Sequence, residues 1–200
     1  MAIKPILFNT EMVRAVLDGR KICTRRLVKF LPGENPQWTG YIRDGLMLYN
    51  GKNEPCIRKA PYQPGDILYV RETWGYPIAL NSDKQYVFRA DEVAESGFKN
   101  DSHIWHPSIH MPKEAARIWL KVTNVRVERL QEISTESALA EGADKYIHTN
   151  GELDENMTIT SFIGIWNSTI KKADLDRYGW NANPWVWVIE FERCEKPKGV

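Results

Sequence analysis

The sequence predicts an α+β fold that is mainly β, arranged as a barrel or rolled sheet with a few short helices at its periphery. Short apolar or alternating segments, which are typical of strands, recur at 21–28, 67–74, 86–90, 113–130 and 185–192. Helical spacing is confined to a few short segments. Strands and helices do not alternate as they do in a doubly wound parallel sheet, so that class is excluded.

Length and composition favour one domain that spans residues 1–200, with one core or at most two small ones. The chain has 200 residues, of which 42% are hydrophobic and 26% charged, as is ordinary for a globular domain with one core. No apolar run approaches the roughly 20 residues that a membrane-spanning helix needs. The first residues, Met-Ala-Ile-Lys-Pro, lack the apolar stretch of a signal peptide. We therefore expect a cytoplasmic protein with no membrane partner.

Cysteine spacing and net charge narrow the classes of partner. Cys23, Cys56 and Cys194 are odd in number and far apart, so they predict neither a disulfide framework nor a zinc site. We expect no metal and no other cofactor. The net charge of +1 argues against tracking a long duplex. A local basic cluster at 14–29 favours a small or short ligand instead.

Two turns should position the sheet. Asn9 and Thr10 precede apolar residues at helical spacing, and Gly19 stands where a left-handed C-terminal cap is expected. The strand at 21–28 follows, with Ile22, Thr24 and Arg26 on one face. Further along, Pro64-Gly65-Asp66 predicts a turn before a strand that is apolar on both faces.

Less regular segments complete the pattern. Residues 31–63 predict an extended loop with a hairpin near 41–49, because Pro, Gly and Asn are frequent there. Ser134-Thr135 caps a short helix that Gly142 ends. A second helix buries a stripe formed by Phe162, Ile163, Trp166 and Ile170.

Gly19, Lys21 and Arg26, which follow that first helix, resemble the G-x-K-x-x-x-x-R signature of the ASCH family in the PUA-like superfamily. The resemblance extends to the turn at 64–66 and to three later segments: 122–127, 140–142 and 184–191. It implies a PUA-like β-barrel with insertions at about 31–62, 76–114 and 143–160. The insertion residues 105–112 (WHPSIHMP) are similar to those of phage and prophage members.

The resemblance implies a cleft that binds RNA or a nucleoside. One branch of the family, the amidohydrolases that act on acetylated cytidine, uses a Lys, a Thr and a Glu, which match Lys21, Thr24 and Glu141 here. Other members are ribonucleases or bind RNA without chemistry. The function expected is a hydrolase of an acylated cytidine or of RNA. The alternative is a non-catalytic module that binds RNA, a nucleotide or a host protein through the same cleft.

The three matching residues can perform amide hydrolysis only if the lysine activates the threonine. A threonine hydroxyl is a weak nucleophile until a neighbouring base removes its proton. Lys21 can be that base only if desolvation or nearby positive charge lowers its pKa. Strand alternation would place Lys21 and Thr24 on opposite faces, so Lys21 must lie in the turn. The plainer alternatives are a solvated lysine, a strand-forming threonine and a surface glutamate.

Several other side chains are candidates for substrate binding. Arg71, Glu72 and Trp74 lie at the end of the strand at 67–74, where an arginine could bind phosphate and a tryptophan could stack on a base. A salt bridge for the charged residues and a core position for the tryptophan are equally good alternatives. Two histidines at i, i+4 could share a metal, but Pro107 and Pro112 argue against a helix there. We expect this segment instead to form a loop over the barrel mouth, as a lid or base-contacting flap, or simply to pack the insertion onto the barrel. The expected substrate-binding residues are Arg20, Arg26, Arg71, Glu72, Trp74, Trp105, His106 and His110.

Overall fold

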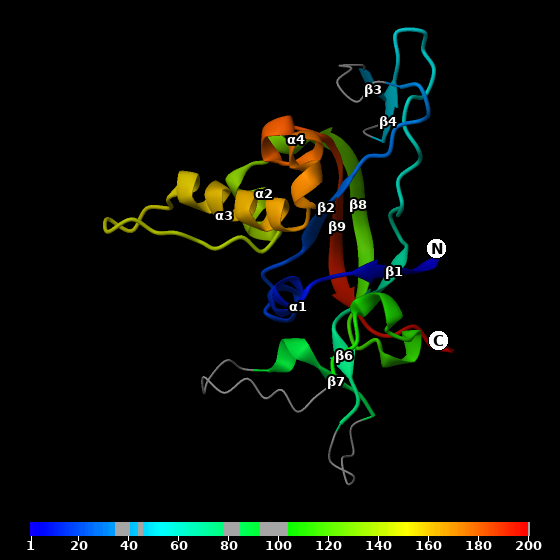
Figure 1. Ribbon diagram of the computed structural model, residues 1–200, viewed down its shortest axis with the longest axis vertical. Coiled ribbons are helices and arrows are strands. Elements are labelled where there is room, and N and C mark those ends of the chain that lie inside the picture. Colours follow the sequence, from blue (N-terminus) through cyan, green and yellow to red (C-terminus); the bar gives the residue numbers. More distant parts are fainter. Residues whose placement is uncertain (35–40, 44–45, 78–84, 93–103, 200) are drawn as a thin grey trace. The chain divides into compact units, whose positions relative to one another are not determined.

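The computed structural model describes residues 1–199 without 35–40, 44–45, 78–84 and 93–103, and this part of the chain combines strands with short helices (Figure 1). Contacts divide it into two units. The first comprises Met1–Gly19, Gly65–Lys121 and Glu192–Val200, and the second comprises Arg20–Pro64 and Val122–Phe191. The predicted class, mixed α+β with a mostly strand main sheet and few short helices, is confirmed.

The first unit is built on three strands. β1 (Ile3–Leu7) runs parallel to β5 (Ile67–Arg71), and β5 pairs antiparallel with the first residues of β8 (Trp119–Arg129). The turn before β5 forms as predicted, with Gly65 at φ +87°. The small strands β6 (Trp74–Gly75) and β7 (Val87–Phe88) pair with each other. The predicted strand at 86–90 is therefore shorter, because a 3-10 turn (Arg89–Asp91) follows at once.

Helix α1 (Thr10–Leu17) forms where its caps predict. Asn9 Oδ1 accepts a hydrogen bond from the Met12 N–H at 2.9 Å. Gly19 adopts φ +74°, a conformation that side chains with a Cβ rarely take, and ends the helix.

The second unit has the strand order β8-β9-β2. β2 (Cys23–Leu27) pairs antiparallel with β9 (Trp185–Cys194), in a register that places Thr24 opposite Ile189. β2 begins two residues later than predicted. Its first three residues are all buried, because both faces are covered at this end, so the expected alternation is absent. β3 (Tyr41–Arg43) and β4 (Met47–Tyr49) form the predicted hairpin.

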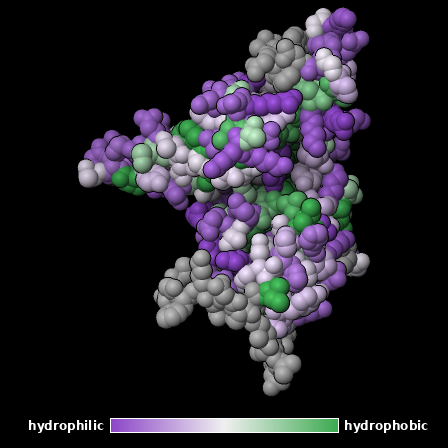
Figure 2. All heavy atoms as spheres, viewed as in Figure 1, coloured by the Kyte–Doolittle hydropathy of each residue, from purple (hydrophilic) through white to green (hydrophobic). Residues whose placement is uncertain are grey.

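Three helices cover this second sheet: α2 (Thr135–Ala140), α3 (Glu155–Ser168) and α4 (Leu175–Tyr178). Figure 1 shows α3 lying beside α2. Phe162 and Trp166 of α3 pack into a core with residues of β2 and β9, among them Cys23, Val186 and Val188. On the face seen in Figure 2, these helices present mostly hydrophilic side chains outward, as an amphipathic layer over a sheet requires.

In neither unit do the described strands close into a barrel. Among the described helices, none is long and apolar enough to cross a membrane.

Phe162→Ala should destabilise the second unit strongly. The ring is 1% exposed and lies edge-on to Trp180 at 6.2 Å, so its removal leaves a cavity that costs about 3–5 kcal/mol. Met157→Ala, on the same helix but 45% exposed, is the control and should cost less than about 1 kcal/mol. Urea unfolding of both variants measures the difference, and equal losses would contradict the assigned core.

Candidate functional site

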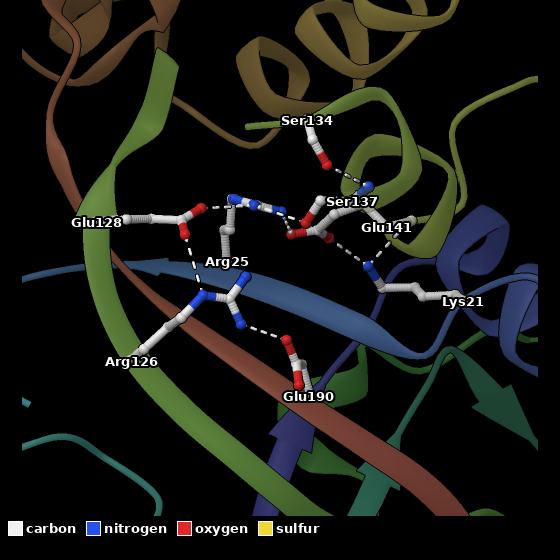
Figure 3. Close-up of polar contacts among 8 residues, drawn as sticks. All are labelled: Lys21, Arg25, Arg126, Glu128, Ser134, Ser137, Glu141 and Glu190. Carbon is white, nitrogen blue, oxygen red and sulfur yellow. Dashed lines mark hydrogen bonds and ion pairs between the residues drawn. The ribbon is translucent and has the colours of Figure 1, made fainter. Parts of the chain in front are cut away.

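Lys21 lies in the turn between Gly19 and β2, as the predicted constellation requires. Its side chain is fully buried, with no exposed area. Nζ donates to Glu141 Oε2 at 2.6 Å and to the Glu141 backbone carbonyl at 2.9 Å (Figure 3). Two residues that are 120 positions apart in the sequence are thus joined by a charge-assisted hydrogen bond.

Glu141 is the C-terminal cap of α2, whose N-terminal cap is Ser134. Gly142, at φ +93°, ends the helix immediately after it. A carboxylate at a helix C-terminus opposes the helix dipole. The Lys21 ammonium compensates for the carboxylate and for the negative end of the helix dipole, because it binds both the Glu141 carboxylate and the Glu141 backbone carbonyl.

Arg25 extends this pair into a network. Its Nη1 lies 3.3 Å from Glu141 Oε1, and its Nη2 donates to Glu128 Oε1 at 2.6 Å and to Ser137 Oγ at 2.9 Å. The guanidinium also lies over the Phe162 ring, 5.7 Å from its centroid. Glu141 is therefore held through both carboxylate oxygens, one by a lysine and one by an arginine.

The network continues toward the surface of the second unit. Arg126 Nε lies 3.1 Å from Glu128 Oε2, and its Nη1 donates to Glu190 Oε1. Three cations alternate with three carboxylates along the path drawn in Figure 3. Exposure rises from the fully buried Lys21 to the partly exposed Arg126, so solvent screens the outer pairs far more than the inner ones. We refer to Lys21, Glu141, Arg25, Glu128, Arg126 and Glu190 as the ion network.

Thr24 lies on β2 and is buried. Among the residues that the structure describes, its hydroxyl shares no hydrogen bond with Lys21 or Glu141. The structure therefore brings together two of the three predicted catalytic residues.

The neighbouring arginines make separate contacts. Arg20 Nη1 donates to the Gly142 carbonyl at 3.3 Å. Burial lowers the pKa of the Arg26 guanidinium, and the nearby Tyr62 and Glu141 oppose that effect. Burial also raises the pKa of the Tyr62 phenol, while Arg26 lowers it. Arg26 and Tyr62 are thus a partly desolvated pair beside the ion network.

Cys23 is buried among the same charges. Burial raises the pKa of its thiol from 9.0 to about 12, and Glu141 adds to the effect, whereas Arg25 and Lys21 oppose it. Cys23 packs in the apolar core of the second unit, and a thiol that keeps its proton is a poor nucleophile, because the thiolate is the reactive form.

The other predicted residues belong to the first unit, and Glu72 has a partner there. Its carboxylate is 1% exposed and accepts two hydrogen bonds from Arg117, each at 2.9 Å. Arg117 also binds both oxygens of Asp91 at 2.8 Å. Burial raises the pKa of Glu72 and Arg117 opposes that rise. Glu72 therefore forms a salt bridge, which was the alternative to substrate binding. Arg71 donates to the Ile109 carbonyl at 3.2 Å.

Trp74 lies at the centre of an aromatic cluster in the first unit. Ring centroids of Tyr76, Tyr86 and His106 lie 5.2, 5.6 and 5.0 Å from its own. Backbone hydrogen bonds in both directions join Trp74 to His106. Trp105 lies under the Arg89 guanidinium at 5.7 Å.

His110 ends a short 3-10 turn, Ser108–His110, and no α-helix forms there, in line with the expectation from the flanking prolines. No group of three or more metal-ligating side chains occurs among the described residues.

Sequence reasoning missed the roles of Glu128, Arg126 and Glu190, and it included Arg25 only within the basic cluster at 14–29. The available signal was charge within predicted strands: Arg25 in β2, and Arg126 with Glu128 beside the apolar Val125 and Val127 in β8. Charged residues at buried strand positions need partners of opposite sign.

Comparison of the chain with known protein families, with curated proteins and with solved structures finds no match.

Lys21→Met should reveal how strongly the buried pair is coupled. Removing one partner leaves Glu141 with only the longer contact to Arg25, and breaking a buried pair costs about 3–5 kcal/mol. Lys121→Met is the matched control, because Lys121 and Glu192 form an exposed pair at 3.4 Å that is worth at most about 1 kcal/mol. Chemical unfolding measures both variants. If Lys21→Met costs no more than the control, the pair is not coupled as described.

The buried Cys23 thiol should make stability fall as the pH rises above 9. The folded state keeps the thiol proton up to about pH 12, whereas the unfolded chain loses it near its ordinary value, so alkaline pH favours unfolding. Cys23→Ala should therefore lose less stability than the unmodified protein between pH 9 and 11, measured by urea unfolding. Parallel curves for the two proteins would refute this assignment.

Proposed function

We propose that this chain is a cytoplasmic ASCH-type protein that hydrolyses an acylated cytidine nucleoside, or acts on RNA, through Lys21, Thr24 and Glu141. The observation that carries the proposal is the 2.6 Å hydrogen bond between Lys21 and Glu141. These two residues were matched by motif alone, and a bond between two randomly chosen charged residues 120 positions apart would be improbable.

The chemistry starts from the proton in that bond. Its transfer from Lys21 Nζ to Glu141 Oε2 leaves a neutral amine beside a carboxylic acid. The amine can then accept the hydroxyl proton of Thr24, and the Thr24 oxygen attacks the acyl carbonyl carbon. The carbon–nitrogen bond breaks, and the nucleoside amine leaves with a proton from the lysine–glutamate pair. Water then hydrolyses the threonine ester, which releases the carboxylic acid and restores the hydroxyl.

Arg25 and Glu128 have a positioning role in this scheme. Arg25 binds the second oxygen of Glu141, so that carboxylate cannot rotate away from Lys21. Substrate binding would complete the site by bringing the Thr24 hydroxyl within about 2.6–3.2 Å of Lys21 Nζ.

A PUA-like barrel belongs to the same proposal. Its support is the Gly-capped helix α1, which leads into β2, and the antiparallel pairing of β2 with the last strand β9.

Binding without chemistry is the second candidate function, and burial favours it. Lys21 and Thr24 are both almost fully inaccessible, so a static ion pair could serve only to shape a surface for RNA or a nucleotide. In the same non-catalytic role, this surface could bind a host protein instead of RNA or a nucleotide.

Turnover of N4-acetylcytidine, followed by chromatography of cytidine and acetate, tests the hydrolase. Thr24→Val keeps the side-chain shape without the hydroxyl and should lower kcat at least about 100-fold. Thr24→Ser keeps a hydroxyl and should retain part of the kcat of the unmodified protein. Short RNAs are assayed in parallel for cleavage.

The controls separate the two candidates. Saturable binding of the nucleoside or RNA that Lys21→Met weakens, with no product from either, would support the binding module. Neither binding nor turnover would reject both candidates, provided that the protein is folded by circular dichroism.

A further inference from the structure

A pocket in the second unit lies apart from the ion network and does not depend on the proposed hydrolase. Its volume is 820 Å³, within the range of about 300–1,000 Å³ that small-molecule sites occupy. Its walls come from the chain after β2 (27–34), the end of β8, the α4 region and the start of β9. Aromatic and apolar side chains predominate, among them Leu27, Phe30, Leu31, Tyr178 and Pro184.

Arg129 is the charged group on this wall that two contacts hold in place. Its guanidinium lies over the Trp185 ring, 4.4 Å from the centroid, and its Nη1 donates to the Asn183 carbonyl at 3.0 Å. Asn183 adopts φ +43°, a left-handed conformation that non-glycine residues take rarely. The same residue accepts the Gln131 N–H through Oδ1. Asn183 therefore accepts two hydrogen bonds, one through its carbonyl and one through its side chain, and the first of them orients the Arg129 guanidinium.

The charge of Arg129 is not matched by an acid. In the part of the chain that the structure describes, no carboxylate lies within ion-pair distance of its guanidinium. The neighbouring Glu128 pairs with Arg25 and Arg126, and Glu132 accepts the Arg129 backbone N–H at 2.9 Å. Burial lowers the pKa of Arg129, and Glu132 only partly opposes this. A partly desolvated guanidinium without a counter-ion is unfavourable, and a bound anion would remove that penalty.

The other charges of the pocket leave it net positive. Its lining includes Lys29 and Arg177 in addition to Arg129, against Glu34 and Asp176. Glu34 already accepts a hydrogen bond from Asn50 Nδ2 at 3.1 Å. The charge balance thus favours an anion at Arg129.

We propose that this pocket binds a planar aromatic molecule carrying one anionic group, with the ring among Phe30, Leu31 and Tyr178 and the anion on Arg129. The aromatic walls suit a flat ring system, and the volume admits one such molecule. Two sources share this chemistry: an aromatic carboxylate and a nucleoside monophosphate.

Isothermal titration calorimetry with two matched pairs tests the proposal on the full chain. The pairs are 2-naphthoate with neutral 2-naphthamide, and adenosine monophosphate with adenosine. The anionic member of at least one pair should bind about tenfold more tightly or better than its neutral partner. Which pair shows the difference identifies carboxylate or phosphate.

Three variants place the site. Arg129→Gln should weaken the anionic probe about tenfold and abolish the discrimination. Arg193→Gln removes an exposed positive charge outside the pocket and should change nothing. Leu31→Trp fills the pocket from an exposed position and should weaken both members of the pair, which keeps the test decisive if Arg129→Gln fails to fold. Equal affinity for charged and neutral probes, no saturable binding, or affinity that neither pocket variant changes would overturn the proposal.

Discussion

One interaction joins the turn before β2 to the end of α2 in the second unit, the buried ion pair of Lys21 and Glu141. Moving two charges out of water is costly, and their attraction repays the cost only where geometry is good and remaining polar groups are bonded. The local structure supplies this geometry. Gly19 ends α1 so that Lys21 falls in the turn, and Gly142 ends α2 so that the Glu141 carbonyl and carboxylate face the same ammonium. The two glycines at positive φ therefore set the ends of the pair.

Both units solve the problem of a buried carboxylate in the same way. In the second unit, Arg25 binds the buried Glu141 and also Glu128. In the first unit, Arg117 binds the buried Glu72 and also the exposed Asp91. A planar guanidinium has donors on more than one edge, so it can bind two acids where a lysine ammonium acts as a point charge. This explains why an arginine lies between a buried and a more accessible acid in each case.

Local sequence signals predicted the elements that local chemistry determines. The Asn9 cap, the glycine ends of α1 and α2, the turn before β5 and the β3–β4 hairpin all formed as expected. The Lys21–Glu141 contact came from motif matching. The start of β2 was placed too early, because burial on both faces removes the alternation that marks a strand. Glu72 and Arg117 are 45 positions apart, and no local pattern links them. The Arg129 pocket was missed for the same reason, since its walls come from four separate segments.

Buried charge by itself is weak evidence about stability, because apolar replacements of similar shape are often as stable. It carries more information when the compensation is compared between sites. Lys21, Glu141 and Arg25 compensate one another within the fold, and the proton-holding or surface-shaping use proposed for them is one that an apolar core could not provide. Arg129 is oriented by Asn183 and Trp185 but lacks an acid among the described residues. The charges of the first arrangement are paired within the fold, whereas a bound anion would supply the counter-charge that the proposed site at Arg129 lacks.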